Sequence, residues 1–149
     1  LALETMTELS ATIRDSFGLY LNKTASELIE GITGGIYRSM SIDQDLNIFM
    51  NTPTRLVPIE QVSSGTMDQI YLAVRLAICE MILPPEQNPP LILDDALLTF
   101  DDARLSTTLD YLTRLGAQRQ ILLFTCQGRE AALLRGRPGV HITNLTQST

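Results

Sequence analysis

The stretch PPLILDDALLTFDD, from Pro89 to Asp102, decides the fold of this chain. Its apolar run, Leu91 to Leu93, is entered through prolines and leads directly into two adjacent carboxylates, Asp94 and Asp95. A run this short and this apolar is typical of a strand that is buried on both faces of a parallel sheet. Ligands of open α/β sheets bind outside the carboxyl ends of the strands, which is where both carboxylates are expected.

The two adjacent carboxylates indicate either a metal site or an acidic turn. Asp94 and Asp95 repel each other unless a cation compensates their charge. Mg2+ is a hard cation that prefers oxygen ligands, so it is the natural candidate. Asp is also common in turns, and a strand that simply ends in an acidic turn explains the same residues. The residues alone leave both interpretations open.

The length and composition are those of a single domain. A chain of 149 residues is long enough to bury about two thirds of its unfolded surface. No apolar run approaches the roughly 18 residues of a membrane span, and the start lacks the basic segment of a signal peptide. Cys79 and Cys126 stand in apolar surroundings without metal-like spacing, which indicates reduced thiols in a cytoplasmic protein. The net charge of -6 argues against a broad nucleic-acid surface on this part of the protein.

Apolar residues at steps of mostly three and four predict a long helix from Leu3 to about Ile32. The apolar face of this helix consists of Leu3, Met6, Leu9, Ile13, Phe17, Tyr20, Leu28 and Ile32. The helix is either the root of a coiled coil or an ordinary core helix, because the seam has too few heptads to decide. The glycines between Gly31 and Gly35 end it, since glycine disfavours helix and permits a left-handed turn.

Three alternating segments after the glycines predict a small antiparallel meander. The segments are Ile36 to Asp43, Leu46 to Asn51 and Leu56 to Ile59. Pro58 places the last of them at a sheet edge or at a strand end, because proline cannot donate to a ladder. The meander carries no evident chemistry.

A polar turn, Ser63-Ser64-Gly65-Thr66, precedes a strongly predicted helix from Met67 to Leu83. The first backbone N–H groups of a helix lack partners, and they lie at the positive end of its dipole. The turn is therefore a candidate anion site. Capping of the helix by the hydroxyl groups explains the same residues and is the simpler interpretation.

The segments after the acidic stretch predict the rest of an α/β sheet. In chain order they are a helix capped by Asp101 or Asp102 and reaching Leu115, an apolar strand from Ile121 to Phe124 that ends in Thr125-Cys126-Gln127, a short helix from Arg129 to Leu134, and a last strand from Val140 to Leu145. Alternation of strands and helices predicts right-handed crossovers and a parallel sheet.

Together these motifs resemble the C-terminal lobe of an ABC-type ATPase head, a P-loop NTPase-like fold, in the group that contains SMC proteins, RecF and the SbcC-like DNA-repair ATPases. Ser63 to Thr66 is similar to the signature motif, Leu91 to Asp95 to the Walker B strand, and Thr99 to Asp101 to the D-loop. The segment from Ile121 to Gln127 is similar to the strand that leads to the switch histidine. Each motif alone is weak, but four in the family's order at plausible separations are fairly specific.

The resemblance implies a role for each motif. Asp94 would hold Mg2+, usually through water. Asp95 takes the position of the general base, where most of the family has Glu and RecF-like members have Asp. Ser63, with the amides of Gly65 and Thr66, would meet the γ-phosphate of an ATP molecule that a second head holds.

The same resemblance covers two further positions. Asp101 would help to form the interface between the two heads. Gln127 stands at the switch position without a histidine; it can hydrogen-bond a phosphate oxygen or water, but it cannot carry a positive charge. His141, the only histidine, is expected to be a surface residue of the last strand.

No G-x-x-x-x-G-K-[ST] motif occurs in the chain, so this chain alone is not expected to bind ATP as P-loop proteins do and is expected to be inactive. In the SMC-like group the P-loop lies far upstream, separated from the C-terminal lobe by long coiled coils. The helical start and the missing initiator Met therefore indicate a fragment. Residues 1–33 would be the returning coiled-coil root, and residues 34–149 the lobe.

The resemblance implies an ATPase that dimerises around ATP and Mg2+ in DNA repair or chromosome maintenance. Its expected partners are an N-terminal lobe with the P-loop, a second copy of the head, and DNA through parts outside this chain, with no membrane. A non-hydrolysing assembly module is the alternative, because Asp95 and the missing histidine are also compatible with a dimer that ATP closes without turnover. A metal-dependent phosphatase using the same carboxylates would require turnover by this chain alone.

Overall fold

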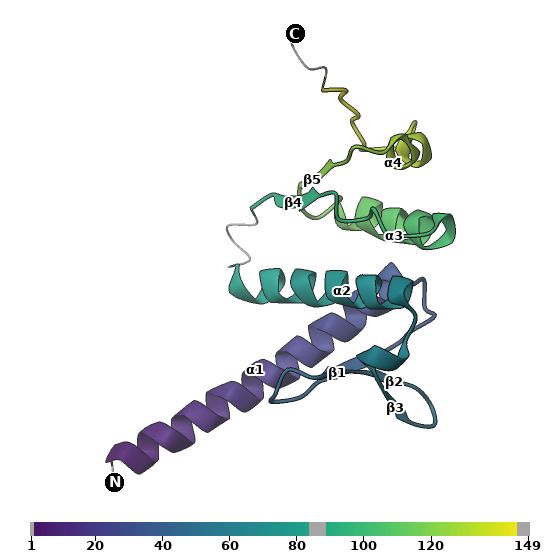
Figure 1. Cartoon of the computed structure of the whole chain (residues 1–149). Helices are drawn as coiled ribbons and strands as arrows, with labels where there is room; N and C mark the ends of the chain where they lie inside the picture. The colour runs from purple at the N-terminus through teal and green to yellow at the C-terminus, as the bar shows by residue number, and fades with distance from the viewer. Residues whose placement is uncertain (1, 84–88, 146–149) are drawn as a thin grey trace.

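The computed structural model describes residues 2–83 and 89–145, with side chains described from residue 15 onward. The elements in chain order are α1 (Ala2–Ile32), β1 (Met40–Ile42), β2 (Ile48–Asn51), β3 (Leu56–Pro58), the 3-10 helix η1 (Ile59–Gln61), α2 (Ser64–Ile82), β4 (Leu91–Asp94), α3 (Asp102–Leu115), β5 (Ile121–Phe124) and α4 (Gly128–Leu134). Figure 1 shows α1 crossing α2 beside the β1–β3 meander, while β4, β5, α3 and α4 form a second layer. The predicted α/β class, with a long helix, a meander and a parallel sheet, is confirmed.

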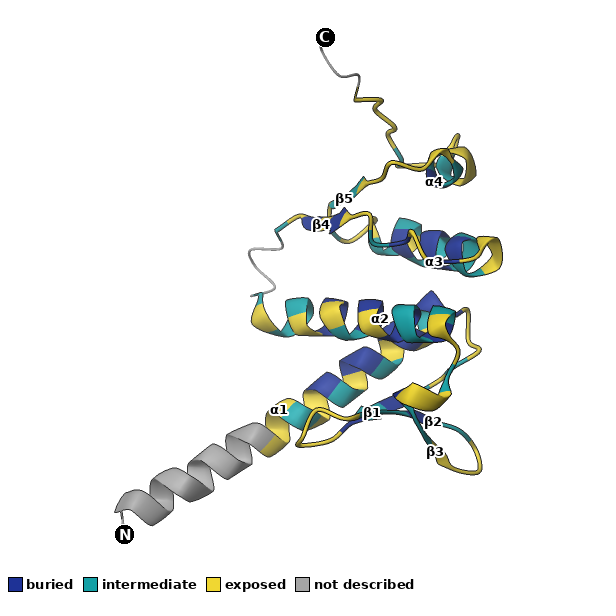
Figure 2. Ribbon diagram, viewed as in Figure 1, coloured by how far each residue is buried: buried dark blue, intermediate teal, exposed yellow. Residues whose placement is uncertain are grey.

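The two long helices meet through their apolar faces, which Figure 2 shows in dark blue. Leu28 and Ile32 on α1 are buried, as the helical spacing predicts. Phe17 and Tyr20 on the same face are 51% and 53% exposed, so the core covers α1 only from Leu21 onward. The predicted positions Leu3, Met6, Leu9 and Ile13 lie outside the described side chains. None of the helices in the described ranges is long and apolar enough to cross a membrane.

The meander has the predicted antiparallel order β1-β2-β3. Polar side chains of α1 fasten its first strand: Ser26 Oγ donates to the carbonyl of Met40 at 3.0 Å, and Asn22 Oδ1 accepts from the backbone N–H of Ile42 at 2.6 Å. Pro58 ends β3 at an edge of the sheet, as predicted, where its missing N–H breaks no ladder. The meander therefore packs beside α1, and Figure 1 shows it away from β4, the strand that ends at Asp94.

The second layer is built on two parallel strands, in which Leu91 pairs with Ile121 and Asp94 with Phe124. The prediction that the first strand is buried on both faces is wrong. Leu91 and Leu93 are each 7% exposed, but Ile92 between them is 63% exposed. The physical reason is that the described helices cover one face of this sheet and leave the other open.

The predicted last strand, Val140 to Leu145, is also wrong: residues 140–145 form no strand. Glycines with positive φ at 136 and 139 turn the chain after α4, and Figure 1 shows the following segment running away from β5. An apolar sequence becomes a strand only beside another strand's edge, and this turn removes the segment from the sheet. His141 is therefore exposed, as expected, but it lies outside any strand.

Candidate functional site

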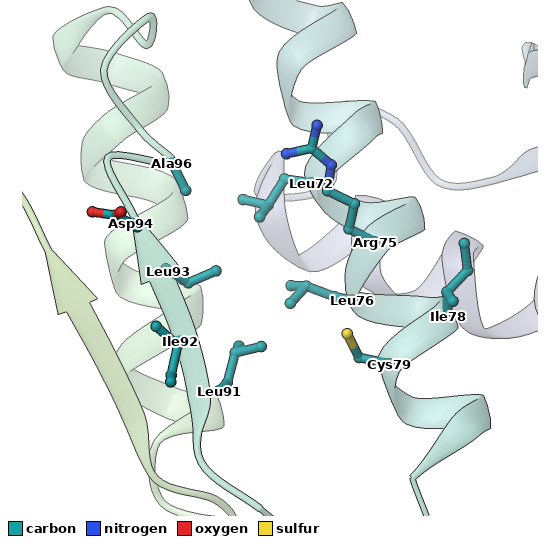
Figure 3. Close-up of a pocket in the computed structure, with 10 residues that line it drawn as sticks. All are labelled: Leu72, Arg75, Leu76, Ile78, Cys79, Leu91, Ile92, Leu93, Asp94 and Ala96. Atoms are coloured by element: carbon teal, nitrogen blue, oxygen red, sulfur yellow. The ribbon is translucent and has the colours of Figure 1, made fainter.

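The two adjacent carboxylates lie at the carboxyl end of the central strand. Asp94 is the last residue of β4, and Asp95 follows it directly. Both residues are exposed. Figure 3 shows the side chain of Asp94 directed away from α2, whereas Leu91 and Leu93 point toward it. The strand thus separates an apolar side, which packs, from a charged end, which faces solvent.

Asp95 has an unusual backbone conformation, with φ of 47°. Asp tolerates this left-handed region better than most residues other than glycine. Two hydrogen bonds hold Asp95 against the end of β5: its N–H donates to the carbonyl of Phe124 at 2.9 Å, and its Oδ1 accepts from the backbone N–H of Cys126 at 3.1 Å. The short side chain of Asp is suited to both requirements. A longer Glu at this position would adopt the same backbone at a higher cost.

The donor set at this strand end fits a magnesium ion. In nucleotide sites Mg2+ keeps several waters and binds one or two carboxylates together with phosphate oxygens. Asp94 and Asp95 supply carboxylates of this kind side by side at the surface. Within the described ranges, His, Cys, Asp and Glu side chains form no group of three or more that could hold a metal by themselves.

The polar turn before α2 is confirmed as a helix cap. Ser63 is the N-cap residue, and its Oγ accepts from the N–H of Thr66 at 3.3 Å. The helix starts three residues before the predicted Met67, so Ser64, Gly65 and Thr66 form its first turn. Ser63 and Ser64 remain exposed, whereas Thr66 is buried. Ser63 thus caps the helix and is exposed at the same time, so the first turn still presents polar groups to solvent.

The structure joins this turn to the acidic residue that begins α3. Asp101 is the N-cap of α3, accepting from the N–H of Arg104 at 2.9 Å, and the two side chains form an ion pair. The same guanidinium donates to Ser63 Oγ at 3.3 Å and reaches Thr66 Oγ1 at 3.5 Å. The backbone hydrogen bond from Arg104, with its guanidinium adding to the effect, lowers the pKa of Asp101. The spacing of Asp101 and Arg104 signals a helical ion pair, but nothing in the sequence places Arg104 beside Ser63.

The segment after β5 is anchored by a second arginine, Arg129, whose role no sequence pattern signals. Gln127 is exposed and precedes α4 directly. Arg129, two residues later, donates to the carbonyls of Leu97, Leu98 and Phe100 at 3.3, 3.0 and 2.7 Å. These carbonyls belong to the loop between β4 and α3. Arg129 therefore connects the segment at Gln127 with the loop that contains Phe100. No local sequence pattern signals this connection.

An apolar cleft of about 410 Å3 separates α2 from β4. Its lining consists of Leu72, Arg75, Leu76, Ile78, Cys79, Leu91, Ile92, Leu93, Asp94 and Ala96. In Figure 3 the leucines of the two walls face each other, and Arg75 extends from α2 near one end. The two layers of the molecule are thus incompletely packed against each other at this point.

The fold is similar to solved head domains of SMC ATPases. A chain from structural work on ATP-driven dimerization and DNA-stimulated activation of SMC ATPases aligns over 87% of this chain and 84% of its own length, with a TM-score of 0.66 and 18% identity. The Smc head domain with an extended coiled coil from Pyrococcus furiosus, bound to the C-terminal domain of ScpA, aligns over 88% of this chain and 35% of its own, with a TM-score of 0.60 and 17% identity. The fold of this chain is therefore similar to that of SMC head domains.

Sequence relatives are much longer proteins. Uncharacterized protein YhaN of Bacillus subtilis is 34% identical over 109 residues, which are 71% of this chain and 11% of YhaN. Uncharacterized protein Rv1278 of Mycobacterium tuberculosis is 33% identical over 88 residues, 58% of this chain and 10% of Rv1278. The chain thus spans about a tenth of the length of the curated relatives it matches. No protein-family model matches it.

Proposed function

We propose that this chain is the C-terminal lobe of an ATPase head that closes as a dimer around ATP and Mg2+ and hydrolyses ATP at the interface, in DNA repair or chromosome maintenance. One observation carries the proposal: Asp94 and Asp95 are exposed at the carboxyl end of β4, and Ser63 and Ser64 are exposed at the start of α2. A site shared between two copies needs both sets at the surface. The similarity to SMC ATPase heads supports the same arrangement.

The residues divide the chemistry of phosphoryl transfer to water. Bound at Asp94, Mg2+ would neutralise charge on the phosphate oxygens. Asp95 orients the attacking water and takes up its proton as the water oxygen bonds to the γ-phosphorus and the bond to the bridging oxygen breaks. Ser63 and the first amides of α2 donate hydrogen bonds to the γ-phosphate of the ATP that the other copy holds.

Completion of the site requires a second lobe that carries the P-loop. The open face of the β4–β5 sheet supports such a partner, because parallel sheets are normally covered on both faces. Ile92, Leu122 and Phe124 on these strands are 63%, 38% and 43% exposed. The N-terminal lobe would cover this apolar surface. The charge of -6 argues against a broad DNA-binding surface on this chain.

The test of the proposed reaction is Asp95→Asn in the complete protein. We expect ATP to bind while phosphate release falls about 100-fold or more, because Asn cannot accept the proton of the attacking water. Asp45→Asn is the matched control, since Asp45 is an exposed residue of the meander turn. An Asp95→Asn protein that hydrolyses ATP at the wild-type rate would show that Asp95 is not the base.

The alternative, an assembly module that ATP closes without turnover, is favoured by the environment of Asp95. One oxygen of its carboxylate is already bonded to the N–H of Cys126, and Gln127 cannot supply a positive charge. Phosphate release by the complete wild-type protein separates the two functions. Turnover that Asp94→Ala abolishes identifies the ATPase, whereas ATP-dependent closure without phosphate release identifies the assembly module.

A further inference from the structure

We propose that Arg104 is a positioning residue with two effects. It sets the hydroxyl of Ser63 as a hydrogen-bond donor, and it connects the Ser63–Thr66 turn with Asp101. The inference rests on the proposed function, because it concerns how the same turn meets a phosphate group. It adds a residue from α3 to a site whose other groups come from α2 and β4.

The guanidinium of Arg104 lies directly on the first turn of α2. Its Nη2 is 3.3 Å from Ser63 Oγ and 3.5 Å from Thr66 Oγ1. A Cβ added to Gly65 would lie 3.1 Å from its Nε and Cζ atoms, a tight contact. Gly65 therefore leaves the space that this approach needs. Ser63 and Arg104 are 41 residues apart in the sequence, so the contact joins two separate segments.

The hydrogen bonds of Ser63 determine the direction of its hydroxyl. A serine hydroxyl offers one donor and two acceptor positions. Ser63 Oγ accepts from the N–H of Thr66 at 3.3 Å and from Arg104 at 3.3 Å, so both acceptor positions are used. Its proton is then donated to Thr66 Oγ1 at 2.9 Å. Phosphate oxygens only accept hydrogen bonds at neutral pH, so on binding the Ser63 proton would turn from Thr66 Oγ1 to the phosphate. Arg104 keeps one acceptor position of Ser63 filled and so favours the donor role of its hydroxyl.

The charges of the cluster explain why Arg104 and Asp101 act as one unit. A cation at the positive end of a helix dipole is unfavourable. The carboxylate of Asp101 pairs with the guanidinium and offsets this cost. Asp101 also caps α3, so a shift of α3 moves the guanidinium and with it the donors of the turn. The arrangement couples the segment at Asp101 to the segment at Ser63 within each copy.

Hydrogen exchange in the complete protein without nucleotide tests the positioning role directly. In Arg104→Gln we expect faster exchange of the Thr66 and Met67 amides than in wild type, because both donate to Ser63 and the turn loses its connection to α3. Arg137→Gln is the control, since it removes a partly exposed ion pair, with Asp110, on another side of α3. Equal exchange of the Thr66 and Met67 amides in Arg104→Gln and wild type would overturn the proposal, whether or not the protein hydrolyses ATP.

Steady-state kinetics test the consequence for the reaction. Arg104→Gln should lower kcat about ten- to hundred-fold, as loss of a residue that supports a reacting group does, and leave KM for ATP within about twofold of wild type. Arg104→Lys keeps the positive charge but lacks the rigid planar fork that spans Ser63 and Asp101, so its kcat should be intermediate. In a Ser63→Ala background, Arg104→Gln should cause little further loss, because both act through one hydroxyl.

The kinetic results separate the role of Arg104 in the reaction from its action through Ser63. Additive losses in the double variant would overturn action through Ser63, and an unchanged kcat in both Arg104 variants would overturn the role in the reaction. A wild-type protein that neither binds nor hydrolyses ATP would instead contradict the proposed function, and the exchange measurement would still decide whether Arg104 holds the turn.

Discussion

Single residues set how closely α1 approaches α3. Gly31 faces the ring of Tyr111, and a Cβ at this position would overlap ring carbons. Gly18, in the same helix, has nothing within 4 Å of an added Cβ. Glycine is therefore required at one position for packing and only tolerated at the other.

This difference predicts opposite effects of one substitution at two positions of α1. Gly31→Ala should destabilise the chain by about 1–3 kcal/mol, because the Tyr111 ring must move. Gly18→Ala should stabilise it by about 0.5–1 kcal/mol through the lower entropy cost of alanine in a helix. Urea unfolding followed by circular dichroism measures both. Equal stabilisation by the two substitutions would refute the packing contact, and Tyr111→Ala should remove most of the penalty at Gly31.

Site residues at this scale were predictable where the signal is local. The apolar run into Asp94 and Asp95 indicates a strand end, and the structure has one there. The same holds for Ser63 and Asp101, whose positions before helices predict the observed caps. Arg104 was not identified, because its contact with Ser63 depends on how α2 and α3 are placed, which no sequence spacing encodes.

At the scale of elements, α2 carries an acidic residue near its C-terminal end. Burial is the main cause that raises the pKa of Glu80; the nearby Glu27 adds to this effect and Arg119 opposes it. The folded protein favours the protonated carboxyl of Glu80. The stability that the protonated carboxyl contributes is fully present below the ordinary pKa of 4.5, and it is lost as the pH rises through the higher pKa of the folded protein. At neutral pH the charged form therefore opposes folding.

The prediction is that Glu80→Gln raises the melting temperature at pH 7. The gain should shrink as the pH falls and vanish below about pH 4, where Glu80 is protonated in both states. Thermal unfolding across this range measures it, with the exposed Glu60→Gln as control. A gain that is the same at pH 4 and pH 7 would assign the effect to something other than the charge of Glu80.

Element types followed from periodicity, but their surroundings did not. The spacing in α1 and the alternation in the meander predict the observed elements to within a few residues. An apolar run such as Leu91 to Leu93 cannot reveal how many layers cover it, and Ile92 is in fact exposed. Nor can the run from Val140 to Leu145 reveal whether a strand edge is within reach. Both errors concern partners outside the segment itself.

At the scale of the whole molecule, the described part of the chain leaves apolar surface uncovered at two places. Its two-stranded parallel sheet has an open apolar face, and a cleft separates its two layers. The proposed function assigns the open face to the lobe that carries the P-loop and the exposed first turn of α2 to a second copy. Two separate surfaces therefore account for the two expected protein partners.

The most direct test is the mass of the complete head, with its two lobes joined, measured by light scattering with ATP and Mg2+. For the Asp95→Asn head we predict the mass of a dimer, because ATP closes the interface and is not hydrolysed. Adding Ser63→Arg should return the mass to that of one head while ATP still binds, since the long cation blocks the shared phosphate site. A monomeric Asp95→Asn head with ATP, or a dimer that persists with Ser63→Arg, would contradict a site shared between Asp94, Asp95 and the turn at Ser63.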